Sequence, residues 1–249
     1  MTEEIEELIH QMNELRMTSM ITKLEMMAEE PDFEYRKTSE VMKELFGYEC
    51  ALRKARKINR LLKRAHLKYP AASLDDSLGE ADRRIDIHRI ESLAQCTWID
   101  DKRNLLVTGK SGTGKTYVSC ALAICALQKG KEVLYNKASR MIEELNECQF
   151  TGNYAAALKR YTEVDLLVID DFGLMSLDLN KCLQLFEVLD AREGNGSILV
   201  ISQIPVKQWY ETFQNNVYAD ACMSRLVSNS YRLEFNGKDM RKAVSEKLK

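Results

Sequence analysis

Hydrophobic residues follow two different patterns along the chain. Up to about residue 66 they recur every three or four positions, which is the spacing of amphipathic helices. The first helical stretch contains Ile5, Leu8, Met12, Leu15, Met20, Leu24 and Met27. Pro31 ends it, and Ser39 is a suitable N-cap for a second stretch that runs into "CALRKARKINRLLKRAHLKY".

The second pattern begins at Asn104. Short apolar runs, "NLLVTG", "EVLYN", "DLLVIDD" and "SILVIS", have the length of buried strands. Helical stretches separate them, at 116–127, at about 138–160 and at 178–192, and Gly130 ends the first of these. Strands that alternate with helices predict an α/β fold, with a parallel sheet flanked by helices.

Between the two patterns, "YPAASLDDSLG" is typical of a linker, and a further helix is expected over residues 80–96. We therefore predict a small all-helical N-terminal domain over residues 1–68. An α/β domain with a short C-terminal tail is expected over residues 69–249.

Composition narrows the class of protein. The 249 residues hold no run of about 18 apolar residues, so no membrane span is expected. The start, "MTEEIEELIH", is acidic and lacks the apolar core of a signal peptide, so we expect a cytoplasmic protein. The seven cysteines form no C-x-x-C pair, which favours reduced thiols over a zinc site or disulfides.

The stretch "GKSGTGKT" has the spacing G-x-x-x-x-G-K-T, and it lies between a predicted strand and a predicted helix. This is the context in which backbone N–H groups and a helix N-terminus bind phosphates. Lys115 is expected to reach the β- and γ-phosphates of ATP, and Thr116 to bind Mg²⁺. The predicted nucleotide site comprises Gly109, Lys110, Ser111, Gly112, Thr113, Gly114, Lys115, Thr116 and Tyr117.

Polar residues follow two of the other strands. Asp170 ends an apolar run, which predicts a carboxylate beside the phosphate loop and a second Mg²⁺ partner. Asp171 is a candidate to polarise the attacking water, the alternative being a solvated turn acid. Ser202 and Gln203 end another strand and are candidates for a contact with the γ-phosphate, although polar strand ends are also common without a function.

These segments, in this order, resemble an AAA+ ATPase. "RKARKINRLLKRAHLKYPAASLDD", "DKRNLLVTGKSGTGKT", "DLLVIDDFG", "ILVISQIPVKQWYETF" and "ADACMSRL" together resemble the IstB-like helper ATPases of insertion-sequence transposition, which are relatives of the DnaC helicase loaders. The resemblance covers nearly the whole chain.

The resemblance implies further roles. Arg225, in "MSRL", falls at the arginine-finger position, which implies a homo-oligomer whose active site is shared between subunits. Arg241 falls where the family has a γ-phosphate-sensing arginine, and Gln203 where many relatives carry Asn. Asp171 stands where many AAA+ proteins carry Glu, and Asp is usual in this branch. Tyr69 lies about where AAA+ proteins often contact the adenine base.

Charge is segregated between two adjoining segments. Residues 1–49 hold thirteen Asp and Glu against five Lys and Arg, whereas residues 51–68 hold eight Lys and Arg and no acid. An apolar face of that basic segment includes Leu52, Ile58 and Leu62. Its cations repel one another without acids to pair with, which favours a polyanion bound through its phosphates, although a solvated face is the common alternative. The predicted DNA contacts are Arg53, Lys54, Arg56, Lys57, Arg60, Lys63 and Arg64.

The acidic N-terminal region is more suited to a protein partner, and the resemblance implies that this is a transposase. We thus expect an ATP- and Mg²⁺-dependent oligomer that binds duplex DNA with little regard to sequence, prepares target DNA and activates a transposase. A DnaC-type helicase loader is the nearest alternative. A nucleotide kinase would need an acceptor site for which no motif is visible, and a DNA-binding scaffold that hardly hydrolyses ATP is a third reading.

Overall fold

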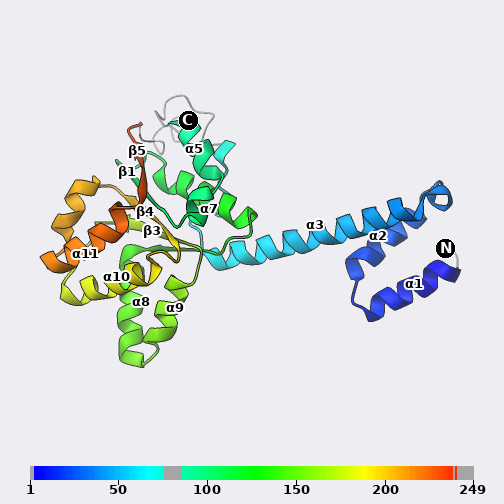
Figure 1. The fold of residues 1–249 in the computed structure, drawn as a ribbon, viewed down its shortest axis with the longest axis horizontal. Helices are drawn as coiled ribbons and strands as arrows, with labels where there is room; N and C mark the ends of the chain where they lie inside the picture. Colours follow the sequence, from blue (N-terminus) through cyan, green and yellow to red (C-terminus); the bar gives the residue numbers. More distant parts are fainter. Residues whose placement is uncertain (1–2, 76–85, 238, 240–249) are drawn as a thin grey trace, which may run out of the picture. The chain divides into compact units, whose positions relative to one another are not determined.

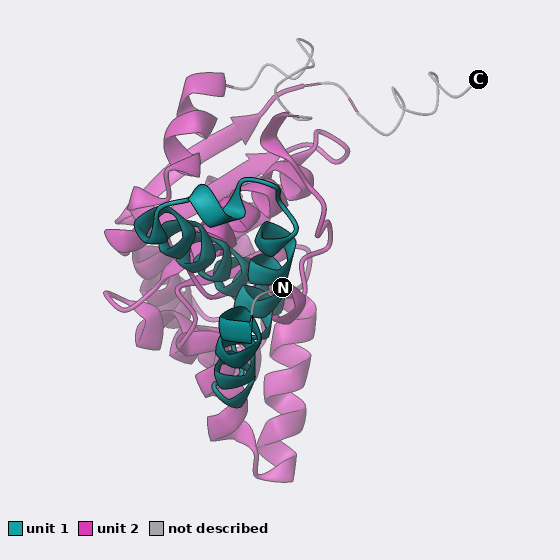
Figure 2. Cartoon of the chain, turned by 90° about the vertical axis from the view of Figure 1, so that its right-hand side faces the viewer, with its two compact units in different colours: residues 1–60 teal, residues 61–249 magenta. Residues whose placement is uncertain are grey.

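A computed structural model of the chain describes residues 3–75, 86–237 and 239. It divides into two compact units, residues 1–60 and 61–249, which are coloured separately in Figure 2. The division falls within one long helix, α3 (Thr38–Ala65). Within the described residues, no helix combines the length and the apolar character needed to cross a membrane.

The first unit is helical, as the apolar spacing predicts. It contains α1 (Glu3–Glu14), α2 (Thr18–Ala28), the short 3-10 helix η1 (Phe33–Tyr35) and the first part of α3. Arg16 has φ of 56°, in the left-handed region, and this residue separates α1 from α2. The side chains of Met12, Met20, Leu24, Met27 and Leu45 form the core of the unit. Leu8 and Leu15, which share the predicted apolar spacing, are 43% and 72% exposed.

The second unit is built on a five-stranded sheet in which every paired strand is parallel (Figure 1). The strands are β1 (Asn104–Gly109), β2 (Val133–Lys137), β3 (Leu166–Phe172), β4 (Ser197–Ser202) and β5 (Ser230–Phe235), in the order β2-β3-β4-β1-β5. The predicted parallel sheet is confirmed. The edge strand β5 adds a fifth strand that the apolar runs do not reveal.

Helices connect the strands. They are α5 (Ile87–Ala94), α6 (Thr97–Asp100), α7 (Lys115–Gln128), α8 (Ala138–Thr151), α9 (Tyr154–Thr162), α10 (Leu179–Arg192) and α11 (Asn216–Val227), with a 3-10 helix η3 (Val206–Thr212). Gly152, with φ of 76°, divides the helical stretch expected at 138–160 into α8 and α9. Of the helix expected at 80–96, the described part begins with Asp86, whose side chain caps α5.

Alternate residues of the strands face two separate apolar cores. Leu105 and Val107 of β1 pack into one core with residues of α5 and α7, whereas Leu106 packs into the other with residues of α8, α10 and α11. Figure 1 shows these two sets of helices around the sheet. The carboxyl ends of the strands are thereby held at one rigid edge, where binding sites of open parallel sheets lie.

Candidate nucleotide-binding site

The phosphate loop joins β1 to α7, as predicted. Gly109 has φ of 144°, and a Cβ atom at this position would lie 2.3 Å from the carbonyl oxygen of Phe235 on β5. Gly114 has φ of 90° and occupies the N-cap position of α7. Glycine is therefore needed at both positions to turn the chain from the strand into the helix.

Lys115 is buried at the start of α7, with 6% of its surface exposed. Its Nζ donates a hydrogen bond to the carbonyl oxygen of Lys110 at 2.7 Å, and the Thr113 hydroxyl donates to the same oxygen at 2.9 Å. A buried ammonium requires such partners. These contacts hold the Lys115 ammonium within the loop, where the N-terminus of α7 also favours an anion.

The two predicted Mg²⁺ partners lie together. Thr116 donates its hydroxyl to Oδ2 of Asp170 at 3.1 Å, and Asp170 is 1% exposed. A hydroxyl and a carboxylate that converge beside a phosphate site suit Mg²⁺, which prefers hard oxygen ligands and shares them with phosphates.

A third residue, Tyr135 of β2, belongs to this cluster, and the motifs did not reveal it. Its hydroxyl donates to Asp170 Oδ2 at 2.6 Å. Burial, followed by the hydrogen bond to Asp170, raises the pKa of Tyr135, so the phenol stays protonated and acts as a donor.

Asp171 follows Asp170 at a bulge in β3. Ile169 pairs with Val200 and Phe172 with Ser202, so that Asp170 and Asp171 together oppose a single residue of β4. Asp171 has φ of 57°, a conformation that Asp tolerates better than most residues. Its carboxylate forms an ion pair with Lys137 Nζ, the last residue of β2, at 2.7 Å. This hydrogen bond raises the pKa of Lys137.

The two residues at the end of β4 differ in their surroundings. Ser202 is fully buried, donates to the carbonyl oxygen of Phe172 at 2.7 Å and accepts from Nε1 of Trp209 at 3.1 Å. Its hydroxyl thus serves the packing of the strand end. Gln203 is exposed. Because Ser202 of β4 pairs with Thr108 of β1, the next residue, Gln203, lies beside Gly109, where the phosphate loop begins. Gln203 is the better candidate for a γ-phosphate contact.

An aromatic pair lies beside the start of α7. The rings of Tyr69 and Tyr117 are 5.6 Å apart between centroids, and the Tyr117 hydroxyl accepts a hydrogen bond from the Ser73 amide at 3.3 Å. Tyr69 remains 40% exposed. The segment after α3 is thereby joined to the loop helix, where an aromatic base could stack.

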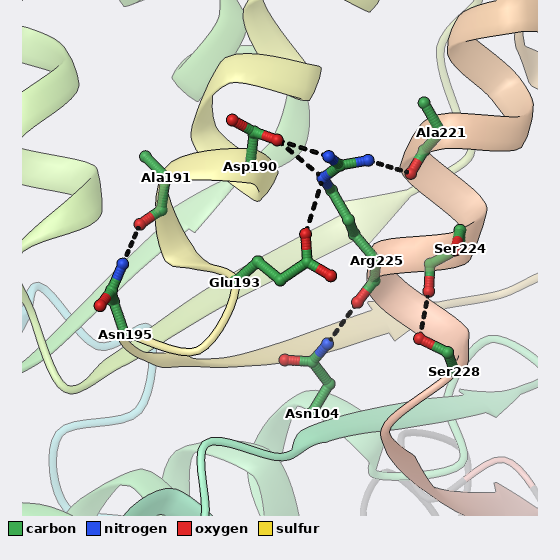
Figure 3. A network of polar contacts seen from close by, with 9 residues as sticks. All are labelled: Asn104, Asp190, Ala191, Glu193, Asn195, Ala221, Ser224, Arg225 and Ser228. Carbon is green, nitrogen blue, oxygen red and sulfur yellow. Dashed lines mark hydrogen bonds and ion pairs between the residues drawn. The ribbon is translucent and has the colours of Figure 1, made fainter.

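Arg225 lies at the opposite end of the sheet from the phosphate loop. Its carbonyl oxygen accepts a hydrogen bond from Nδ2 of Asn104 at 2.9 Å (Figure 3). Asn104 is the first residue of β1, and the phosphate loop follows Gly109, the last residue of this strand. Five strand steps of about 3.3 Å, or about 16 Å in all, separate these two ends of β1. The structure does not bring Arg225 together with the phosphate loop of its own chain.

All seven cations predicted to contact DNA are exposed on α3. Arg53 forms an ion pair with Glu49 at 2.6 Å, and Arg56 donates to the hydroxyl of Ser19 at 2.9 Å. No ion pair within the described residues involves the remaining five, Lys54, Lys57, Arg60, Lys63 and Arg64. The apolar face of this segment is less buried than its spacing suggests, since Leu52, Ile58 and Leu62 are only half-buried. Arg241 lies outside the described residues.

Comparison with known proteins agrees with this fold and with the binding of ATP. Residues 10–248 match the model of the family described as IstB-like ATP binding protein. An insertion sequence ATP-binding protein named y4uH, from Sinorhizobium fredii, is 35% identical over 198 residues, which cover 80% of this chain and 79% of that protein.

Two solved structures share the fold at lower identity. The DnaC helicase loader superposes with a TM-score of 0.57 at 18% identity, over 68% of this chain and 99% of that one. The replication initiator DnaA bound to AMPPCP and single-stranded DNA gives a TM-score of 0.56 at 20% identity, over 74% of this chain and 56% of that one. The chain thus spans little more than half the length of DnaA.

The match over almost the whole chain agrees with a parallel sheet that carries a phosphate loop and a buried acid on the next-but-one strand. This chain therefore belongs to the family of IstB-like ATP binding proteins, within the AAA+ fold.

Proposed function

We propose that this protein is a Mg²⁺-dependent ATPase of insertion-sequence transposition, which hydrolyses ATP at a site shared between subunits while bound to DNA. The observation that carries the proposal is the cluster of Thr116, Tyr135 and Asp170 beside the phosphate loop, with Asp171 next to Asp170. The relative from Sinorhizobium fredii is named for an insertion sequence and for ATP binding, which supports this setting.

Each residue of the site has a distinct proposed role. Lys115 binds the β- and γ-phosphates, and Thr116 and Asp170 hold Mg²⁺, which neutralises phosphate charge when it is bound. Asp171, which follows Asp170 at the bulge in β3, polarises the attacking water. Gln203 contacts the γ-phosphate or that water.

The position of Arg225 supports a site shared between subunits. The Arg225 backbone lies beside the start of β1, about 16 Å along that strand from the loop of the same chain, which favours an action of its side chain on a nucleotide bound by a neighbouring subunit. An arginine supplied in this way stabilises the charge that develops during phosphoryl transfer.

The DNA surface that we propose is the basic side of α3. Arg53, Lys57, Arg60 and Arg64 follow one another at spacings of three and four residues, so they share one side of the helix. Eleven helical steps of about 1.5 Å spread them over about 16 Å, a length suited to several successive phosphates. Contacts of this kind bind duplex DNA with little regard to sequence.

For the first unit we propose a protein partner, the transposase of the element. Its surface exposes Met26, Met42 and Phe46 at 56%, 48% and 51%, and large exposed apolar side chains are common where proteins dock. A DnaC-type helicase loader remains the alternative, because the DnaC fold is also matched. Co-purification with a transposase or with a replicative helicase separates the two.

The decisive experiment for the shared site mixes two inactive variants. Lys115→Ala should lose productive ATP binding, and Arg225→Ala should bind ATP but fail to hydrolyse it. Mixed together, they should recover part of the activity, because some interfaces then join an intact loop to an intact arginine. If Arg225→Ala alone hydrolyses ATP at the rate of the unaltered protein, the arginine does not act in trans.

A further inference from the structure

The guanidinium of Arg225 is held by several contacts within its own subunit (Figure 3). Both Nε and Nη2 donate to Oδ1 of Asp190, the Nε bond being 3.1 Å long, and Nε lies 3.2 Å from Oε2 of Glu193. Nη1 donates to the carbonyl oxygen of Ala221 at 3.2 Å. One face of the guanidinium covers the ring of Phe186, 4.7 Å from its centroid. An arginine proposed to act on another subunit is thus bound by groups of its own subunit.

The charges of this network are unbalanced. Two carboxylates, from the last turn of α10 and the residue that follows it, face one guanidinium. The Arg225 side chain is 22% exposed, but those of Asp190 and Glu193 are 51% and 60% exposed. Ion pairs with such exposed carboxylates are weak enough to exchange for a stronger anion.

A triphosphate bound by a neighbouring subunit would be such an anion. Arginine binds phosphate oxygens and carboxylates with the same fork of N–H donors, so the two kinds of partner compete for one guanidinium. Phe186 contributes no charge, and its contact fixes the side of the ring on which the guanidinium lies.

We propose that Asp190 and Glu193 are positioning residues that hold Arg225 within its own subunit and release it when a neighbouring subunit presents bound ATP. The inference rests on the proposed trans role of Arg225. The two acids would set how much assembly is needed before hydrolysis begins, so that isolated subunits keep their ATP.

The test is the dependence of ATP turnover per subunit on protein concentration. In the variants Asp190→Asn and Glu193→Gln, and in the pair combined, the side-chain shape stays but the charge is lost. The protein concentration that gives half-maximal turnover should fall about 1.5- to 5-fold for each carboxylate removed, the range expected from an exposed ion pair. Glu163→Gln is the matched control, because it removes an exposed pair with Lys159, 3.4 Å apart, on α9.

Two further measurements distinguish the proposed role of Asp190 and Glu193 from a role in folding alone. ATP affinity and the thermal midpoint are measured for each variant, because a loss of fold would lower both. The single substitutions provide the test if the combined variant does not fold.

An unchanged concentration dependence in folded variants would overturn the proposal, as would reduced turnover at every concentration, which would mean that the acids aim Arg225 for catalysis. The Arg225→Ala variant separates this inference from the proposed function. If Arg225→Ala is inactive and the acid variants behave like the unaltered protein, the shared site stands and the holding role fails.

Discussion

At the scale of single residues, the Asp170 carboxylate shows how the fold prepares a buried charge. It is 1% exposed, and it accepts hydrogen bonds from the Thr116 and Tyr135 hydroxyls and from the Asp171 amide, the last at 2.8 Å. A buried carboxylate is costly unless such donors replace water. They also fix the direction in which its oxygens point.

We predict that Tyr135→Phe raises the Mg²⁺ concentration that nucleotide binding requires. The substitution removes one donor to Asp170 and leaves the ring in place, so Asp170 loses orientation while the core keeps its volume. The loss of about 1 kcal/mol expected for one hydrogen bond corresponds to a roughly fivefold higher Mg²⁺ concentration for half-maximal ATP affinity. The measurement is ATP binding during a Mg²⁺ titration, so it does not depend on turnover.

Asp171→Asn is the contrasting variant in the same experiment. It should bind ATP with an unchanged Mg²⁺ requirement and lose most of its turnover, because the proposed base is lost and Asp170 is not. Equal Mg²⁺ midpoints for Tyr135→Phe and the unaltered protein would assign Tyr135 to packing alone. A raised midpoint in Asp171→Asn would exchange the roles of the two acids.

Local sequence revealed some of these residues and not others, for a physical reason. The loop glycines, Lys115 and the two acids follow one another in short motifs whose geometry is local. Tyr135 and Lys137 reach the site only because β2 pairs with β3 in a register that sets Lys137 opposite Asp170. Such pairing between distant segments leaves no mark in either one alone.

At the scale of elements, strands buried on both faces could be predicted most closely. The bounds of β1 and β4 coincide with the apolar runs, whereas β5, "SYRLEF", is an edge strand with exposed Arg232 and Glu234 and lacks such a run. Helix ends depended on backbone conformation: Gly152 divides α8 from α9 and Arg16 divides α1 from α2. The spacing of apolar residues can continue across such a break, because it reflects which side chains are buried and not whether the helix is continuous.

The prediction at this scale concerns DNA binding by helix α3. Substituting Gln for Lys57, Arg60 and Lys63, which are exposed and form no ion pair among the described residues, should weaken binding to every duplex by a similar factor. If each cation neutralises one phosphate, the slope of log K against log salt falls by about 0.9 per cation, or about 2.7 in all. Salt titrations of duplex affinity measure this slope, and ATP affinity should stay unchanged.

The matched control for α3 is a triple substitution of Gln for Lys159, Lys207 and Arg232, which removes the same charge from exposed positions of the second unit. An effect confined to the α3 variant supports a local DNA surface. Equal effects in both variants would indicate attraction by overall charge, and an effect in the control alone would move the DNA surface to the second unit.

At the scale of the whole molecule, each unit provides a different kind of contact. The second unit separates the phosphate loop from Arg225 by the length of β1, so the proposed active site is complete only when subunits meet. The DNA surface proposed on α3 would add a second means of gathering subunits, because several chains bound to one duplex are held at a high effective concentration. ATP and DNA should therefore favour assembly through independent contacts.

This leads to a prediction about size in solution. The assembly should be larger with ATP than with ADP, because the γ-phosphate provides the anion that Arg225 meets across the interface, and ADP lacks it. Duplex DNA should add to the effect of ATP. Light scattering after size separation measures the mass of the assembly with each nucleotide, with and without duplex DNA. Arg225→Ala should reduce the difference in mass between ATP and ADP. The α3 variant should reduce the increase in mass caused by DNA. Equal masses in ATP and ADP would mean that subunits assemble through contacts that do not involve the nucleotide, and Arg225 would then have to be assigned to the packing of α10 against α11, where its ion pairs already lie.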